Sequence, residues 1–255
     1  GRIQEEDAKY LGKHKLSRHE KPEPLYDEAT AKSAMKLFQG VEFHQQFEIG
    51  DIKVSLQPAG HILGASSVII EAEVGFSGDV GRPQDIMMYP PEPLPDLDLL
   101  LLESTYGDRL HKETEDAEEQ LAAVVKETSE AGGVLLIPSF SVGRAQLLQY
   151  LLVKLMEEGR IPRQPIYLDS PMAINVSGLY QRYHQLHRLS DSDCARTFGT
   201  VEYTRSVDES KAIASQSGPH IIIAGSGMAT GGRILHHFKR WLGDHRATVL
   251  FSGHQ

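Results

Sequence analysis

A histidine, an aspartate and a glutamate stand at the ends of three predicted strands in the first half of the chain. His61 follows the β-rich run 52–56 and lies between two glycines, Asp79 lies in Gly-Asp-Val-Gly after a second run, and Glu103 follows the leucine-rich run 97–102. Each residue alone is typical of a polar group that caps a loop. Together, on glycine-flanked turns that let the backbone bend sharply, they predict a metal or acid–base site.

Six motifs, in order, resemble one protein family. The first three are GHILGAS, FSGDVGR and ESTYGDR, and the next three are IPSFSVGRAQ, DSPMA and GSGMATGGR. This series is similar to the metallo-β-lactamase-fold nucleases that carry a β-CASP insert, RNA-processing enzymes akin to the nuclease subunit of the pre-mRNA 3′-end cleavage complex and its bacterial and archaeal relatives. The resemblance covers nearly the whole chain, and several motifs in order are far more specific than any one.

The resemblance implies roles for the three strand-end residues. His61 and Asp79 would be metal ligands, and Asp79 would bridge two zinc ions at the spacing suited to two-metal hydrolysis. Glu103 would orient a downstream histidine that assists the leaving group. The alternatives are a buried loop histidine, an aspartate that stabilises its own turn, and a strand-end acid bonded to Ser104 or Thr105.

The glycine-rich stretch 225–233 lies between a predicted strand and a predicted helix, where backbone N–H groups face an anion. The family resemblance places this loop near the substrate phosphates, so Ser226, Thr230 and Arg233 are candidate contacts to an RNA backbone. The alternative is a tight turn in which Arg233 pairs with an acid. Arg144, at the start of another helix, is a fourth phosphate-binding candidate.

Two nearby patterns favour a structural interpretation. His236 and His237 are adjacent on a predicted helix and point to different faces, so they cannot serve one site. Asp169 and Ser170 provide an acid and a hydroxyl without a histidine at a recognisable spacing, which argues against a serine triad.

The sequence also departs from the family pattern. The main metal cluster, His-x-His-x-Asp-His, does not occur in the chain, and neither do two further histidine motifs expected downstream. We therefore expect an internal piece of a longer nuclease, with a partial metallo-β-lactamase domain over 1–106 and a C-terminally incomplete β-CASP domain over 107–255. Because a zinc ion needs about three or four ligands, we expect an empty or weakly occupied metal site and no nuclease activity in this chain alone.

The composition of the chain limits the classes of protein and of partner that are compatible with it. The 255 residues carry a net charge of −9, which is not the footprint of a protein that binds nucleic acid over its whole surface. A local cationic groove remains compatible with RNA as the partner. The one cysteine fits a reducing compartment, and we expect a cytoplasmic protein. No apolar run reaches the length of a membrane span. The chain could also form a homo-oligomer, which the sequence does not decide.

The predicted secondary structure changes near Gly107, from mainly strands to helices that alternate with strands. Residues 1–24 are expected to be irregular, 27–38 helical, and 41–49 a strand, before an antiparallel sheet from 52–56, 67–72 and 75–77. The leucines of 97–102 predict a strand buried on both faces. Afterwards helices (114–131, 141–158, 173–186, 208–216 and 233–242) alternate with strands (134–137, 166–168, 220–224 and 248–251), while 188–200 is expected to be irregular. The fold class is therefore α/β: part of a metallo-β-lactamase αββα sandwich, then a parallel β-CASP domain.

The interpretation that we favour is a zinc-dependent ribonuclease. One alternative is another metallo-β-lactamase-fold hydrolase, acting on a thioester or lactam, but such enzymes lack the α/β insert. The other is a non-catalytic RNA-binding or scaffold paralogue. An intact upstream histidine cluster would favour the nuclease.

Overall fold

The computed structural model describes residues 1–108 and 114–252, without the side chains of 114–116. The chain divides into two compact units, Gly1–Phe47 and Glu48–Gln255, which are described separately. The boundary expected near Gly107 falls inside the second unit and stays a prediction. Within the described residues, no helix combines the length and the apolar character needed to cross a bilayer.

The first unit contains two helices, α1 (Arg2–Lys13) and α2 (Glu28–Met35). Asp27, the first residue of the expected helix, caps α2, because its side chain accepts the Thr30 N–H at 2.7 Å. The expectation of an irregular start was wrong. Gln, Glu, Ala, Lys and Leu are good helix formers, and Ile3, Tyr10 and Leu11 fall on one side of α1, a helical period that the sequence analysis missed.

The strand expected over 41–49 is much shorter. Only β1 (Phe47–Ile49) forms, and His44 has a φ of 64°, outside the strand region. His44, inside the expected strand, therefore lies outside any strand.

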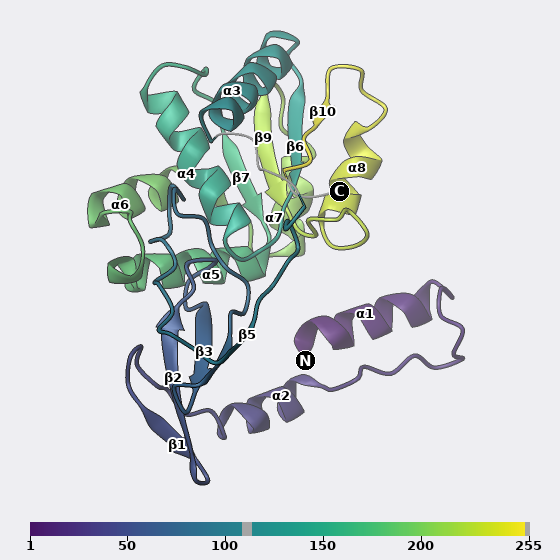
Figure 1. Cartoon of the computed structure of the whole chain (residues 1–255). Helices are drawn as coiled ribbons and strands as arrows, with labels where there is room; N and C mark the ends of the chain where they lie inside the picture. The colour runs from purple at the N-terminus through teal and green to yellow at the C-terminus, as the bar shows by residue number, and fades with distance from the viewer. Residues whose placement is uncertain (109–113, 253–255) are drawn as a thin grey trace. The chain divides into compact units, whose positions relative to one another are not determined.

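The first sheet has the order β1-β2-β3-β4-β5 (Figure 1). Its further strands are β2 (Ile52–Pro58), β3 (Ser66–Ile70), β4 (Val74–Phe76) and β5 (Leu99–Leu101). The expected antiparallel pairing holds for β2 with β3 and for β3 with β4, whereas β5 runs parallel to β4. The turns after β2 and β4 and the end of β5 carry the three strand-end residues.

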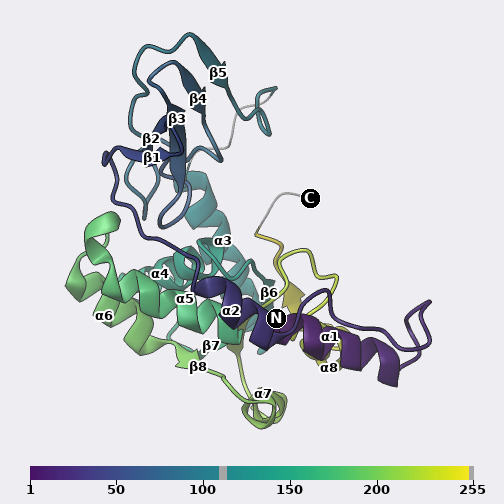
Figure 2. The same cartoon turned by 90° about the horizontal axis from the view of Figure 1, so that it is seen from below.

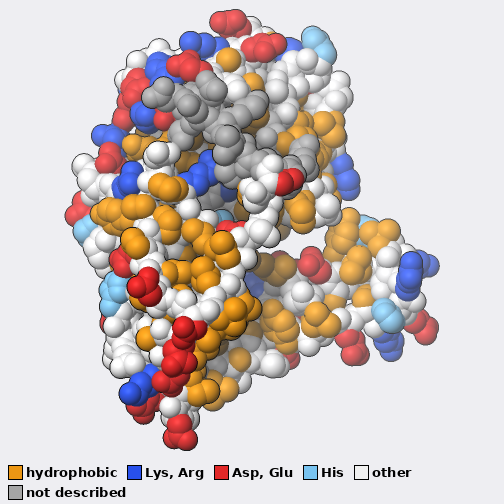
Figure 3. Space-filling view, viewed as in Figure 1, with side chains coloured by type: hydrophobic (Ala, Val, Ile, Leu, Met, Phe, Trp, Pro, Cys, Tyr) orange, Lys and Arg blue, Asp and Glu red, His pale blue; other side chains and the backbone are white. Residues whose placement is uncertain are grey.

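The leucine run was wrongly expected to be buried on both faces. Leu99, Leu100 and Leu101 are 56%, 41% and 47% exposed, because β5 is the last strand of its sheet. Hydrophobic side chains gather over this part of the surface (Figure 3). A continuous apolar run predicts burial only when neighbouring elements cover both faces of the strand.

The second sheet is parallel throughout, in the order β10-β6-β9-β7-β8. Its strands are β6 (Val134–Pro138), β7 (Ile166–Asp169), β8 (Glu202–Tyr203), β9 (His220–Ala224) and β10 (Thr248–Val249). The central strands β6, β7 and β9 are buried along their whole length. The alternation of strands and helices in the sequence thus predicted the parallel lobe correctly.

Helices cover both faces of this sheet (Figures 1 and 2). One face packs against α3 (Thr114–Glu130), α4 (Arg144–Glu157) and α5 (Pro171–Arg182), and the other against α7 (Val207–Ile213) and α8 (Ile234–Trp241). Successive strand residues alternate between the two cores: Leu135 and Ile137 face one, and Leu136 faces the other. A short turn, η1 (His184–Leu186), follows α5.

The segment expected to be irregular, 188–200, contains α6 (Asp191–Thr200). Ser190 and Asp193 form a capping box, in which each side chain bonds the other residue's backbone N–H. The Ser-x-x-Asp spacing was visible in the sequence, but the polar composition of the segment concealed it.

An extended segment between β4 and β5 packs against the parallel lobe. Met88 forms a backbone bridge with His187, and the Arg188 N–H donates to the Met87 carbonyl at 2.7 Å. Both methionines are buried in one apolar cluster with Tyr180. These contacts join the segment that follows the Asp79 turn to α5 and the residues after it.

Candidate functional site

His61 lies on the tight turn that follows β2. The Ala59 N–H bonds the Ala65 carbonyl at 2.9 Å and closes the turn. Gly60 has a φ of 69°, and a Cβ there would lie 2.6 Å from the Tyr89 carbonyl oxygen, so only glycine fits. The side chain of His61 is consequently held at the surface, 46% exposed.

Asp79 lies on the loop after β4, which packs directly on the His61 turn. The Gly81 N–H donates to the Ala59 carbonyl at 2.7 Å, and a Cβ at Gly81 would lie 2.0 Å from the Gly60 carbonyl oxygen. The two glycines therefore allow the loops to touch through their backbones. His61 Nε2 and Asp79 Oδ2 are 4.0 Å apart.

Glu103 joins them from the end of β5. Its Oε1 accepts the Val80 N–H at 2.8 Å, and its own N–H donates to Ser77 Oγ at 3.0 Å. The Val80 N–H, the bonds from Thr105 and the charge of His61 lower the pKa of the Glu103 carboxyl, so it is ionised at neutral pH. The structure thus confirms that His61, Asp79 and Glu103 lie together, and it also shows the expected alternative bond to Thr105.

His61 and Asp79 offer the kinds of donor atom that zinc binds, an imidazole nitrogen and a carboxylate oxygen. Among the described residues, however, no group of three or more His, Cys, Asp or Glu side chains converges as a metal site. The two donors therefore fit part of a zinc coordination shell and do not complete one.

Arg144 begins α4 beside the His61 turn. Its neighbour Gly143 has a φ of 75°, and a Cβ at Gly143 would lie 3.0 Å from Ile62 Cγ2. Burial, followed by the charge of nearby Arg82, lowers the pKa of the Arg144 guanidinium. Arg144 and Arg82 therefore lie near each other, and the nearby Asp85 carboxylate offsets part of their charge. Arg82 was not among the predicted residues, although it ends the FSGDVGR motif.

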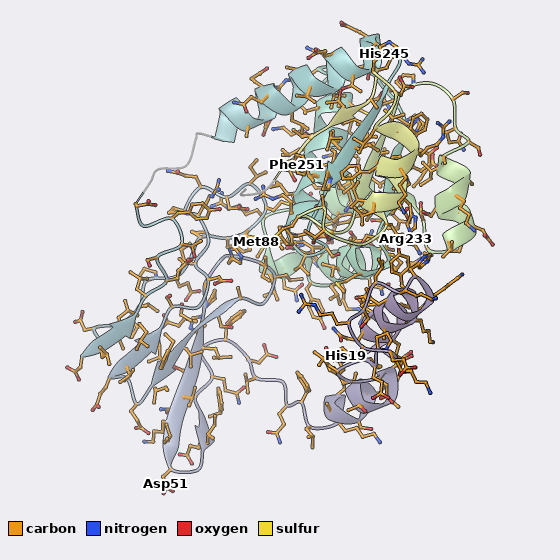
Figure 4. The ribbon with its side chains drawn as sticks, turned by 90° about the vertical axis from the view of Figure 1, so that its right-hand side faces the viewer. His19, Asp51, Met88, Arg233, His245 and Phe251 are labelled. Atoms are coloured by element: carbon orange, nitrogen blue, oxygen red, sulfur yellow. The ribbon has the colours of Figure 1, made fainter. Side chains whose placement is uncertain are left out.

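The three candidates of the glycine-rich loop have different surroundings. Arg233, labelled in Figure 4, is 21% exposed, and its Nη1 pairs with Asp169 Oδ1 at 2.5 Å. It also donates to the carbonyls of Thr204 and Arg205. The sequence alternative, a turn in which Arg233 pairs with an acid, describes this arrangement.

The other two candidates in the loop, Ser226 and Thr230, carry hydroxyl groups. The Ser226 hydroxyl is buried and finds no hydrogen-bond partner among the described residues, while Thr230 is exposed. Contact of these side chains with RNA stays a prediction.

The carboxylate of Asp169 is the centre of a buried hydrogen-bond network that the sequence analysis did not identify. Its carboxylate is fully buried at the end of β7 and accepts hydrogen bonds from Ser210 Oγ at 2.5 Å and His237 Nε2 at 2.7 Å, besides the Arg233 pair. Burial opposes its ionisation, but the bonds from His237, Ser210 and Arg233 outweigh burial and lower its pKa. His237 is structural, as expected. An acid directly after a buried strand was the available signal.

Comparison with known proteins adds evidence of descent. Residues 145–255 match the family model described as the Beta-Casp domain. The chain is 36% identical to Ribonuclease TTHA0252 of Thermus thermophilus over 244 residues, 91% of this chain and 56% of that protein.

Archaeal and animal proteins are similar as well. Transcription termination factor FttA of Methanocaldococcus jannaschii is 30% identical over 94% of this chain and 40% of its own length. Cleavage and polyadenylation specificity factor 73 of Drosophila melanogaster is 28% identical over 94% of this chain and 36% of its own. The chain thus spans about half, or less, of the length of these relatives.

Proposed function

The chain belongs to the β-CASP family of metallo-β-lactamase-fold nucleases, and from this premise we propose that it forms part of an enzyme that hydrolyses RNA phosphodiester bonds. One relative is named a ribonuclease and another, from Schizosaccharomyces pombe, an endoribonuclease. The observation that carries the proposal is the 4.0 Å approach of His61 Nε2 and Asp79 Oδ2, with Glu103 anchored on the same loop.

Nucleases of this family depend on metal ions, and zinc is the ion that we propose here. His61 and Asp79 would bind it, and the bound ion would supply an activated water and neutralise phosphate charge. The Val80 N–H holds the ionised carboxylate of Glu103, which can therefore accept a hydrogen bond from a proton-bearing side chain and orient it. Arg144 and Arg82 would favour the substrate phosphate electrostatically.

The test uses the full-length protein and the Asp79→Ala variant. We expect this variant to lose RNA cleavage while the parallel lobe stays folded, because the side chain of Asp79 is 77% exposed. Asp51→Ala is the matched control: Asp51, labelled in Figure 4, is an exposed acid in the turn before β2, whereas His61 follows the other end of that strand. Metal-dependent cleavage that persists in Asp79→Ala would refute the assignment. Wild-type protein that binds RNA without cleaving it would favour the scaffold alternative.

A further inference from the structure

An exposed aromatic ring lies at the edge of the parallel sheet where Asp169 ends β7 and the glycine-rich loop 225–233 follows β9. Phe140, in the motif IPSFSVGRAQ, comes just after β6 ends at Pro138, and it is 49% exposed. Single exposed apolar residues are common on protein surfaces and need no explanation by themselves. The packing of this ring, however, distinguishes it from a side chain that simply points into water.

The glycine-rich loop covers one face of the ring. A Cβ built at Gly227 would lie 2.6, 2.8 and 2.9 Å from Phe140 Cδ2, Cε2 and Cγ. Because these three adjacent ring atoms are almost equally distant, Gly227 lies over the face of the ring and not beside its edge. Only glycine leaves room for so close a contact. The exposed area of the ring therefore belongs to its opposite face and its rim.

The backbone that carries the ring is held as well. The Phe140 carbonyl accepts the Ala145 N–H at 3.2 Å, in the first turn of α4, and the Ser139 N–H donates to the Ala224 carbonyl at 2.9 Å. A phenylalanine side chain has few rotatable bonds, so a ring that is already packed on one face loses little freedom when its open face is covered. The ring is therefore a flat apolar platform, preorganised for a ligand.

The turn that carries the platform borders the His61 turn. A Cβ at Gly143, which lies in the turn between Phe140 and α4, would be 3.0 Å from Ile62 Cγ2, and Ile62 directly follows His61. Arg144 begins α4 at the end of this turn and supplies a positive charge. One short loop thus joins the ring to a guanidinium and to the neighbour of a candidate metal ligand.

Building on the proposed function, which brings an RNA phosphodiester to His61 and Asp79, we propose that the open face of Phe140 stacks on a nucleobase of the bound strand. Every base has a π face, so an aromatic platform holds a single strand without reading its sequence. An apolar peptide is the rival occupant, but the adjacent Arg144 favours a ligand that carries negative charge along its backbone.

The first test measures the affinity of the full-length protein for RNA in the presence of a chelator, so that cleavage does not interfere. Fluorescence anisotropy compares a labelled oligouridylate with a labelled ribose-phosphate oligomer of the same length that lacks bases. Phe140→Leu keeps an apolar side chain but removes the aromatic face, and it should weaken oligouridylate binding by roughly 5- to 100-fold. The affinity for the abasic oligomer should stay unchanged. Equal weakening for both oligomers, or for neither, would overturn the proposal.

Tyr183→Leu is the matched control. Tyr183 is 40% exposed and caps the C-terminal end of α5, whereas Ser170, at the other end of that helix, lies 3.2 Å from Ser141, the neighbour of Phe140. This control removes a ring of similar exposure at a distance from the sheet edge, and it should bind both oligomers as the wild type does. Equal weakening by Phe140→Leu and Tyr183→Leu would also overturn the proposal.

Tryptophan fluorescence gives a second readout that does not depend on how well Phe140→Leu folds. The tryptophan of this chain, Trp241, is only 7% exposed, and the wild-type protein serves as the blank. Phe140→Trp keeps an aromatic face at the sheet edge, so oligouridylate should quench the added emission and the abasic oligomer should not. Added emission that ignores saturating oligouridylate would refute the stacking. A protein that stacks the base but never cleaves RNA with its metal restored would overturn only the proposed function.

Discussion

Replacing Asp169 by alanine should be among the most damaging single changes in the parallel lobe. The carboxylate is fully buried, and three side chains donate to it: Arg233, His237 and Ser210. Alanine would leave Arg233, itself only 21% exposed, without its counter-charge. It would also leave the His237 and Ser210 donors unsatisfied in the interior.

The expected loss of stability follows from these contacts. Removing one partner of a buried ion pair costs about 3–5 kcal/mol, because the other charge stays buried and uncompensated. For a unit of this size each kcal/mol lowers the melting temperature by roughly 2–4 °C, so the melting temperature should fall by about 6–20 °C. Ser210→Ala removes one donor and should cost about 1–3 kcal/mol.

Urea unfolding followed by far-UV circular dichroism measures the free energy of unfolding of each variant. Asp208→Ala is the matched control. Asp208 is 95% exposed, and its ion pair with Lys211, at 3.7 Å, lies at the surface, so the free energy of unfolding should change by less than about 0.5 kcal/mol. A cost below about 1 kcal/mol for Asp169→Ala would refute the reasoning that this carboxylate organises the loop after β9. Equal costs for Asp169→Ala and Asp208→Ala would refute it as well.

Two further measurements test the pH response and the metal site. Burial lowers the pKa of His187, whose Nδ1 accepts the Leu189 N–H, so the unfolded chain binds this proton more readily than the folded one. His187 should therefore contribute a constant amount to the free energy of unfolding above about pH 6.5 and less as the pH falls below it. His220, whose pKa burial also lowers, adds to the same decline, so His187→Gln should reduce the slope; an unchanged slope would contradict the assignment. The 255-residue chain should bind zinc only weakly, because two donors supply about half of the roughly 10–16 kcal/mol of a complete site, which corresponds to a micromolar to sub-millimolar dissociation constant. Isothermal titration calorimetry measures this constant, and two zinc ions that survive gel filtration against a chelator would show the site to be complete.

The sequence alone determined the order of elements in the parallel lobe and the residues that meet at the first sheet. Apolar strands that alternate with amphipathic helices leave few arrangements besides a parallel sheet covered on both faces. The glycines beside His61 and Asp79 are a local signal as well, because they mark sharp turns at strand ends. That is why His61, Asp79 and Glu103 could be grouped before any coordinates were known.

Tertiary structure decided what those elements contact. Arg233 and Asp169 are 64 residues apart, and no spacing rule predicts that β7 and the loop after β9 place them 2.5 Å apart. The exposure of Leu100 depends on the position of β5 at the edge of its sheet, which the leucine run does not encode. Local sequence specifies backbone conformation and periodicity, whereas burial and ion pairing depend on which distant segments meet.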